Sequence, residues 1–139
     1  MLSTIIEAAQ NFCIHQIRIE HSIHDNISKT RTLIAYIDIE RSNGDKYRVY
    51  LSADKSFIQR VSQIFLEEDE SDEETLIDMA LETTNLIVGS AKVLSENSDM
   101  TYTISTPHFE KIDIFDFEYD DLKVIQVESD KLTVAIKEL

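Results

Sequence analysis

A carboxylate, a carboxamide and a glycine recur at helical spacing in the middle of the chain, as Glu82, Asn85 and Gly89. Positions three or four apart lie on the same face of a helix, so these residues would share one strip. An uncharged carboxamide both donates and accepts hydrogen bonds, so Asn85 could hold a neutral water molecule. A carboxylate one turn away could enter the same shallow cleft of another molecule. The spacing alone leaves open whether this strip is a site or a solvated helix edge.

The element that must carry this strip is a long helix predicted over Asp72 to Asn97. Ser71 as N-cap and Glu74 three residues later form a capping box, and more than twenty residues follow without proline. At 100° per residue, a polar stripe about 80° wide contains Asp78, Glu82, Asn85, Gly89 and Lys92. The remaining positions predict a deeply buried helix, with one apolar face of Leu76, Met79, Ala80, Thr83, Leu86, Ile87, Ser90, Val93 and Leu94, widened by Ile77, Leu81, Val88 and Ala91.

Gly89 needs a reason, because glycine in a helix interior costs about 1 kcal/mol relative to alanine. Close approach of another backbone would supply one. The alternative is a solvated helix edge with an incidental glycine, and periodicity alone leaves both open.

Two segments carry a longer ordered pattern, Glu82-Thr-Thr-Asn85-Leu-Ile-Val-Gly89 and Tyr102-Thr-Ile-Ser-Thr-Pro107. Together they resemble the signature of the CheX/CheC family of chemotaxis phosphatases, in which a helix with Glu-x-x-Asn-x-x-x-Gly leads into a strand ending in a Thr-Pro or Pro-Pro turn. The chain has one such motif, as in CheX, whereas typical CheC has two. Length and element order extend the resemblance over residues 1–139 as one CheX-like domain.

The resemblance implies a phosphatase for the aspartyl phosphate of a CheY-like response regulator. Glu82 would pair with a lysine at the regulator's active site, and Asn85 would orient the attacking water. Asp78, Glu82 and Gly89 would contact the regulator. The chain would bind no cofactor or metal of its own, because the Mg²⁺ that neutralises the phosphoryl oxygens would belong to the partner.

A second hypothesis is a non-catalytic adaptor module of the same fold in chemotaxis or flagellar switching. Such relatives are expected to lose the glutamate and asparagine, and this sequence keeps Glu82 and Asn85. A hydrolase with a nucleophilic serine or cysteine is disfavoured, since no nucleophile lies in a recognisable elbow or beside a plausible base.

Composition limits the classes of molecule that this protein could bind. The 139 residues carry a formal net charge of -14, which would repel nucleic acids and anionic lipids. No apolar run is long enough to span a membrane and no signal segment is evident, so a cytoplasmic protein is expected.

The one cysteine, Cys13, excludes an internal disulfide and fits a packed small hydrophobe. His21 and His24 have no further ligands at suitable spacing for a metal site.

The other elements predict an α+β domain with a mostly antiparallel sheet of five or six strands packed against long helices. Asn43-Gly44 predicts a hairpin with a type I′ turn, and Asp54 is the expected N-cap of a helix with Phe57, Ile58, Val61, Ile64 and Phe65 inward. The acidic run 67–74 is expected to be a solvated link, since it lacks the glycine of a calcium loop. The predicted helices span 2–16 and 55–67, and the predicted strands span 32–40, 46–52, 100–105, 111–117, 122–127 and 132–136.

We also expect a homodimer. An open sheet edge exposes unpaired backbone groups, and CheX-like proteins resemble dimers that join sheets edge to edge. Arg31, Arg41 and Arg48 lie in or near the first hairpin and could offset repulsion between two acidic protomers, or could be ordinary surface residues.

Overall fold

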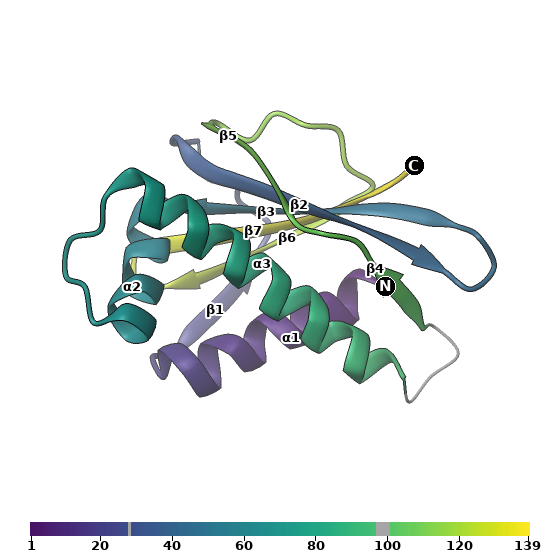
Figure 1. Cartoon of the computed structure of the whole chain (residues 1–139), viewed down its shortest axis with the longest axis horizontal. Helices are drawn as coiled ribbons and strands as arrows, with labels where there is room; N and C mark the ends of the chain where they lie inside the picture. Colours follow the sequence, from purple (N-terminus) through teal and green to yellow (C-terminus); the bar gives the residue numbers. More distant parts are fainter. Residues whose placement is uncertain (28, 97–100) are drawn as a thin grey trace.

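The computed structural model describes residues 1–27, 29–96 and 101–139. A helical layer lies against one face of an antiparallel sheet (Figure 1). The helices are α1 (Leu2–Phe12), continued by the π-helical turn η1 (Cys13–Ile17), α2 (Lys55–Leu66) and α3 (Glu73–Ser95). The strands are β1 (His21–His24), β2 (Thr32–Arg41), β3 (Lys46–Asp54), β4 (Tyr102–Ile104), β5 (His108–Asp113), β6 (Asp121–Val127) and β7 (Asp130–Glu138).

The α+β fold class is confirmed, but the sheet has seven strands in the described part of the chain rather than five or six. Their order is β1-β6-β7-β3-β2-β4, and β5 pairs with β2 beside β4. The additional strand is β1, which pairs with β6 over residues 21–24. Because β2 and β3 lie inside the sheet, the first hairpin is not an edge. The edges are β1 on one side and β4 with β5 on the other.

The hairpin around Asn43-Gly44 is confirmed, but its turn type differs from the prediction. The Gly44 amide donates to the Arg41 carbonyl at 2.9 Å, and the Arg41 amide donates to the Asp45 carbonyl at 2.8 Å. Gly44 has φ +95°, whereas Asn43 is not among the residues with positive φ. The loop therefore has three residues with glycine in the left-handed position, which makes a type I turn with a bulge instead of type I′.

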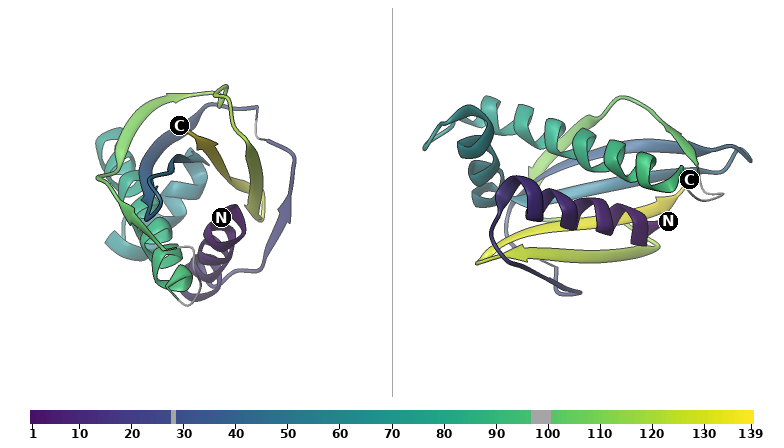
Figure 2. Two further views of the ribbon diagram at one scale, coloured as in Figure 1. Left: turned by 90° about the vertical axis from the view of Figure 1, so that its right-hand side faces the viewer. Right: turned by 90° about the horizontal axis from the view of Figure 1, so that it is seen from below.

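Alternate residues of β2 face two different apolar layers. Leu33, Ile37 and Ile39 pack in the main core with the helices, whereas Ile34 and Tyr36 face the other side. On that helix-free side the segment 114–120 crosses the sheet (Figure 2) and places Phe115 and Phe117 against Tyr50. The sheet is thus covered by helices on one face and by an aromatic loop on the other.

The first helix is confirmed as a core element. Ile5, Ala8, Ala9, Phe12 and Cys13 are all buried, and α1 packs along α3 (Figure 2). Burial raises the pKa of the Cys13 thiol to about 11, because the thiolate would lose its hydration. Cys13 is therefore a packed, unreactive thiol at neutral pH.

The strand predicted at 111–117 is displaced toward the N-terminus, to β5 at residues 108–113. A register shift between Ile34 and Ala35 accompanies the pairing of β5 with β2. His108 begins this strand and stacks on Tyr36 with ring centroids 5.3 Å apart. The strand predicted at 100–105 is β4, although Met100 lies outside the described residues, as does Asn97 at the predicted end of the long helix.

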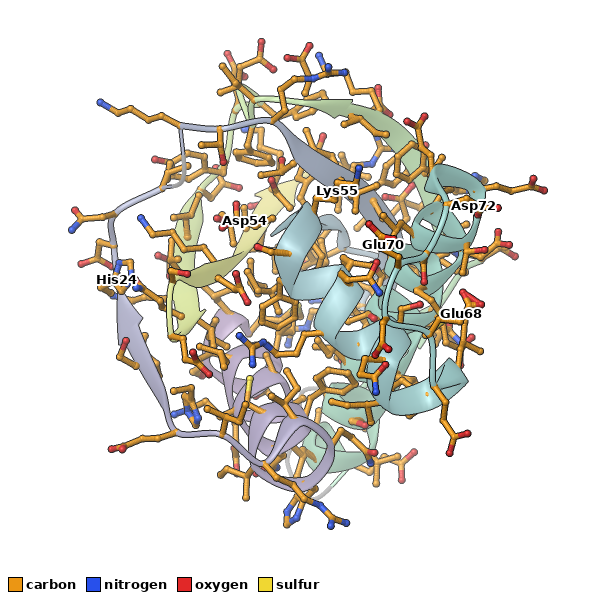
Figure 3. The ribbon with its side chains drawn as sticks, turned by 90° about the vertical axis from the view of Figure 1, so that its left-hand side faces the viewer. His24, Asp54, Lys55, Glu68, Glu70 and Asp72 are labelled. Atoms are coloured by element: carbon orange, nitrogen blue, oxygen red, sulfur yellow. The ribbon has the colours of Figure 1, made fainter. Side chains whose placement is uncertain are left out.

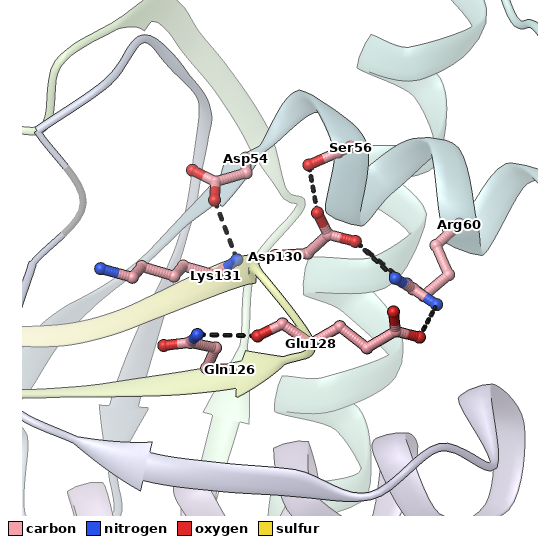
Figure 4. A network of polar contacts seen from close by, with 7 residues as sticks. All are labelled: Asp54, Ser56, Arg60, Gln126, Glu128, Asp130 and Lys131. Atoms are coloured by element: carbon pink, nitrogen blue, oxygen red, sulfur yellow. Dashed lines mark hydrogen bonds and ion pairs between the residues drawn. The ribbon is translucent and has the colours of Figure 1, made fainter.

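A polar network anchors α2 to the turn between β6 and β7 (Figure 4). Arg60 donates to the Asp130 carboxylate at 2.7 Å and 3.1 Å, and Ser56 donates to the other oxygen of that carboxylate. Asp54 occupies the predicted N-cap position, but its side chain accepts from the Lys131 amide at 2.9 Å and makes no cap hydrogen bond. This side chain therefore joins the helix start to β7.

The inward face predicted for α2 is correct at three of five positions. Phe57, Ile58 and Val61 are buried, whereas Ile64 and Phe65 are 38% and 40% exposed. Phe65 lies near Phe12, with ring centroids 6.2 Å apart. The last turn of α2 thus reaches past the edge of the core.

Candidate functional site

The site begins with the start of α3. Asp72 is the N-cap, because its side chain accepts from the Thr75 amide at 2.8 Å. The predicted cap Ser71 lies one residue too early; its hydroxyl pairs with Ser62 and its amide donates to Gln59. The hydrogen bond from Thr75 lowers the pKa of Asp72, since it favours the ionised carboxylate. The acidic link leading to this cap is mostly exposed (Figure 3).

The buried side of α3 fixes the helix against the rest of the domain. It contacts α1, α2, β2, β4 and β5. Thr83 and Thr84 are buried, and their hydroxyls donate to the Met79 and Ala80 carbonyls at 2.7 and 2.8 Å. From β4, the Tyr102 hydroxyl donates to the Val88 carbonyl at 3.1 Å. The packing of this side and the Tyr102 hydrogen bond set the rotation of the helix about its axis, whereas the two threonine hydroxyls are satisfied within the helix itself.

That rotation directs the predicted strip to solvent. Glu82 and Asn85 are exposed at the middle of α3, and Met79 is buried, as the periodicity predicts. Asp78 is also exposed, while Gly89 and Lys92 are half-buried. Among the described residues, no hydrogen bond or ion pair engages the side chains of Asp78, Glu82 or Asn85. The carboxylates and the carboxamide are thus available to another molecule.

The exposed face of α3 is wider than the sequence predicts. Leu86, predicted to be buried, is 37% exposed, and Val93 is 62% exposed. Ser90 is also exposed, and Leu94 is half-buried. At 100° per residue, Leu86 and Val93 lie within about 40° of Glu82, on the side of the helix away from the buried Thr84 and Ala91. The surface around Glu82 and Asn85 therefore includes apolar groups that sequence periodicity assigned to the core.

The described residues give no steric reason for Gly89. A Cβ built on Gly89 meets no other described segment within 4 Å, so none of residues 1–27, 29–96 and 101–139 makes the close approach that the glycine suggested. The helix backbone there is ordinary, because the positive-φ glycine of the chain is Gly44. The space beside Gly89 is therefore open to another molecule as far as the described residues are concerned.

No group suited to metal binding is present in the part of the chain that the structure describes. His21 and His24 lie on the edge strand β1, where His24 pairs with Gln126 at 2.7 Å and His21 with Gln10 at 3.4 Å. A cavity of about 180 Å³, lined partly by Arg31, Lys55 and Glu73, lies at the start of α2 and α3. Glu82 and Asn85 do not line it. None of the described helices has the length and apolarity to cross a membrane.

The fold and strip define a class of protein: an α+β domain whose longest described helix exposes a Glu-x-x-Asn pair that no other described side chain engages. A family model described as "Chemotaxis phosphatase CheX" matches residues 34–125, which is more than half of the chain. The chain therefore belongs to the CheX family. No curated protein sequence matches it.

Solved structures agree in fold. The chemotaxis protein CheX from Vibrio vulnificus superimposes with a TM-score of 0.80 at 15% identity, over 98% of this chain and 97% of that one. A putative chemotaxis protein from Desulfovibrio vulgaris Hildenborough gives 0.78 at 18% identity, over 99% and 96%. A CheX–CheY–BeF3–Mg²⁺ complex from Borrelia burgdorferi gives 0.69 at 14% identity, over 99% and 97%.

Proposed function

We propose that this protein hydrolyses the aspartyl phosphate of a CheY-like response regulator in the cytoplasm, with residues 1–139 acting as one domain. The observation that carries the proposal is the exposed pair Glu82 and Asn85 at the centre of α3, with neither side chain engaged among the described residues. Family membership and the CheY partner in the Borrelia burgdorferi complex support this class of substrate.

Asn85 is proposed to orient the attacking water. Its carboxamide accepts from and donates to water without changing charge, so it can hold a neutral nucleophile in line with the phosphorus. Hydrolysis of an acyl phosphate needs little covalent help from the protein, because positioning and charge stabilisation lower most of the barrier. A rigid helix suits this task, and α3 is held in place by its packing against α1, α2 and β2 and by the hydrogen bond from the Tyr102 hydroxyl to the Val88 carbonyl.

Glu82 is proposed to dock with a lysine of the regulator, while Asp78 and Gly89 contact its surface. Asp78 and Glu82 lie one turn apart on the same face of α3 as Asn85, so one surface could receive all of them. Mg²⁺ would be held by the regulator, as the composition of the Borrelia burgdorferi complex suggests. This chain would then supply the asparagine and the docking surface, and the partner would supply the metal and the phosphoryl group.

The experiment is regulator dephosphorylation. The regulator is phosphorylated with a small-molecule donor, and loss of phosphate is followed with catalytic amounts of wild type, Asn85→Ala or Gln16→Ala. Gln16→Ala removes another exposed carboxamide, on η1, and is the matched control. Wild type and control should accelerate hydrolysis, and Asn85→Ala should not. Equal rates with and without wild-type protein would reject the phosphatase and favour the adaptor module.

We further propose a homodimer with one Glu82 and Asn85 strip on each protomer. The sheet order makes β1, or β4 with β5, the edges available for pairing, in place of the first hairpin. Arg48 pairs with Asp38 at 2.8 Å, and Arg31 donates to the carbonyl of Ile112, which lies in β5. Joining at β1 would place the interface at the opposite edge of the sheet from β4 and β5, the edge strands that α3 contacts.

A further inference from the structure

Two exposed apolar side chains lie on the same ridge of α3 as the candidate site. Glu82, Leu86, Gly89 and Val93 follow one another at spacings of four, three and four residues, which places them on one line along the helix surface. Leu86 is 37% and Val93 62% exposed. Gly89 lies between them and has open space where a Cβ would be. The ridge therefore consists of two apolar side chains, Leu86 and Val93, on either side of a notch at Gly89.

We propose that Leu86 and Val93, with the notch at Gly89, form the apolar part of the docking surface for the phosphorylated receiver domain of the regulator. This proposal rests on the proposed function. Receiver backbone or a small side chain would enter the notch, and the methyl groups of Leu86 and Val93 would pack on either side of it.

Distance along the helix favours the receiver as occupant. At about 1.5 Å per residue, Leu86 lies ~1.5 Å and Val93 ~12 Å beyond Asn85 along the axis. A domain of about 100 residues has a radius of gyration of roughly 13 Å. A receiver that places its phosphoryl group at Asn85 therefore extends over Val93 as well. Apolar groups beside a polar hot spot exclude water and strengthen its contacts.

Charge argues against a second copy of this chain as the occupant. A two-fold contact through the ridge would bring Asp78 and Glu82 of two protomers together, and each protomer has a net charge of -14. It would also cover Asn85 and close the site. The ridge can serve the receiver or a homodimer, but not both.

The test compares Leu86→Gln and Val93→Gln with Ile114→Gln, which changes an apolar residue whose exposure, 46%, lies between theirs, at the start of the segment 114–120. Glutamine is a good helix former, so the α3 variants should melt like wild type. Binding is measured to the regulator loaded with BeF3⁻ and Mg²⁺, a stable mimic of the phosphoryl group, and hydrolysis is measured at low and saturating regulator.

Each α3 variant should weaken binding and raise KM about tenfold, a change of about 1.4 kcal/mol, with kcat within twofold of wild type. Ile114→Gln should match wild type. If wild type is active and the α3 variants bind normally, the docking surface is wrong and the proposed function stands. If they instead dissociate a dimer without changing regulator binding, the ridge belongs to protomer contacts. If wild type neither binds nor hydrolyses, both proposals fail.

Discussion

Gly89→Ala separates a structural role of the glycine from a role in binding. A Cβ at this position meets nothing within 4 Å, so alanine fits without strain. Alanine also loses less backbone entropy in a helix, so the free energy of unfolding should rise by about 0.5–1 kcal/mol. With an unfolding entropy of about 2.1 cal/mol/K per residue, the melting temperature of a 139-residue chain should rise by about 2–3 °C.

Regulator dephosphorylation should change in the opposite direction. A side chain in the notch holds α3 away from the receiver, and a displacement of ~1 Å at reacting groups can cost roughly 100-fold in rate. Gly89→Ala should lower kcat/KM, and Gly89→Gln should lower it further, by at least about tenfold, while both melt above wild type. Ser90→Ala, at the next exposed position, is the control for helix propensity.

Two results would refute this reasoning. A lower melting temperature for Gly89→Ala, measured by calorimetry, would mean that the glycine serves the fold of the chain itself. Full activity of Gly89→Gln would mean that no partner approaches the helix at this point.

Three further predictions concern charge and assembly. Glu82→Lys should weaken regulator binding more than tenfold, measured by titration, because it places like charges together, whereas Glu7→Lys on α1 should not. Asp72→Ala should lower the melting temperature at pH 7. Because the native pKa of Asp72 lies below its ordinary value of 3.8, the difference in melting temperature between wild type and variant should shrink as the pH falls below that value. The same difference at pH 2 and pH 7 would contradict this, and Glu70→Ala is the control. Sedimentation at tens of micromolar should give a dimer, and a monomer would reject the edge-to-edge assembly.

Local sequence signals predicted the helices and hairpins well. The apolar spacing of 2–16 and the absence of proline after Ser71 depend on neighbours within one or two turns, and the structure confirms both helices. Asn43-Gly44 identified the hairpin, but the choice between a two-residue and a three-residue loop depends on strand register, which the turn residues alone do not determine.

Long-range packing accounts for the errors. Periodicity counts Leu86, Val93 and Phe65 as core because it measures hydrophobicity, whereas burial depends on which face of each helix packs against other elements. The shift of the strand from 111–117 to 108–113 has a similar cause, since its partner is β2, some 75 residues away. The contact of Arg60 with Asp130 joins positions 70 residues apart and has no local signal.

The candidate strip was predictable because its residues lie on one helix. Asp78, Glu82 and Asn85 are exposed as the spacing requires, since a single helix fixes their relative positions without knowledge of the fold. The exposed apolar residues Leu86 and Val93 were not predicted, because the sequence pattern does not distinguish an apolar face that packs inside from one that stays exposed.

The most direct test of the central proposal is a single-turnover measurement of aspartyl-phosphate hydrolysis with saturating wild type or Asn85→Ala, beside the affinity of each for the regulator loaded with BeF3⁻ and Mg²⁺. If Asn85 orients the water, the variant should bind within about twofold of wild type, because an exposed carboxamide adds little to affinity, and its hydrolysis rate should fall about 100-fold or more. Equal hydrolysis rates for the two proteins would contradict the proposal.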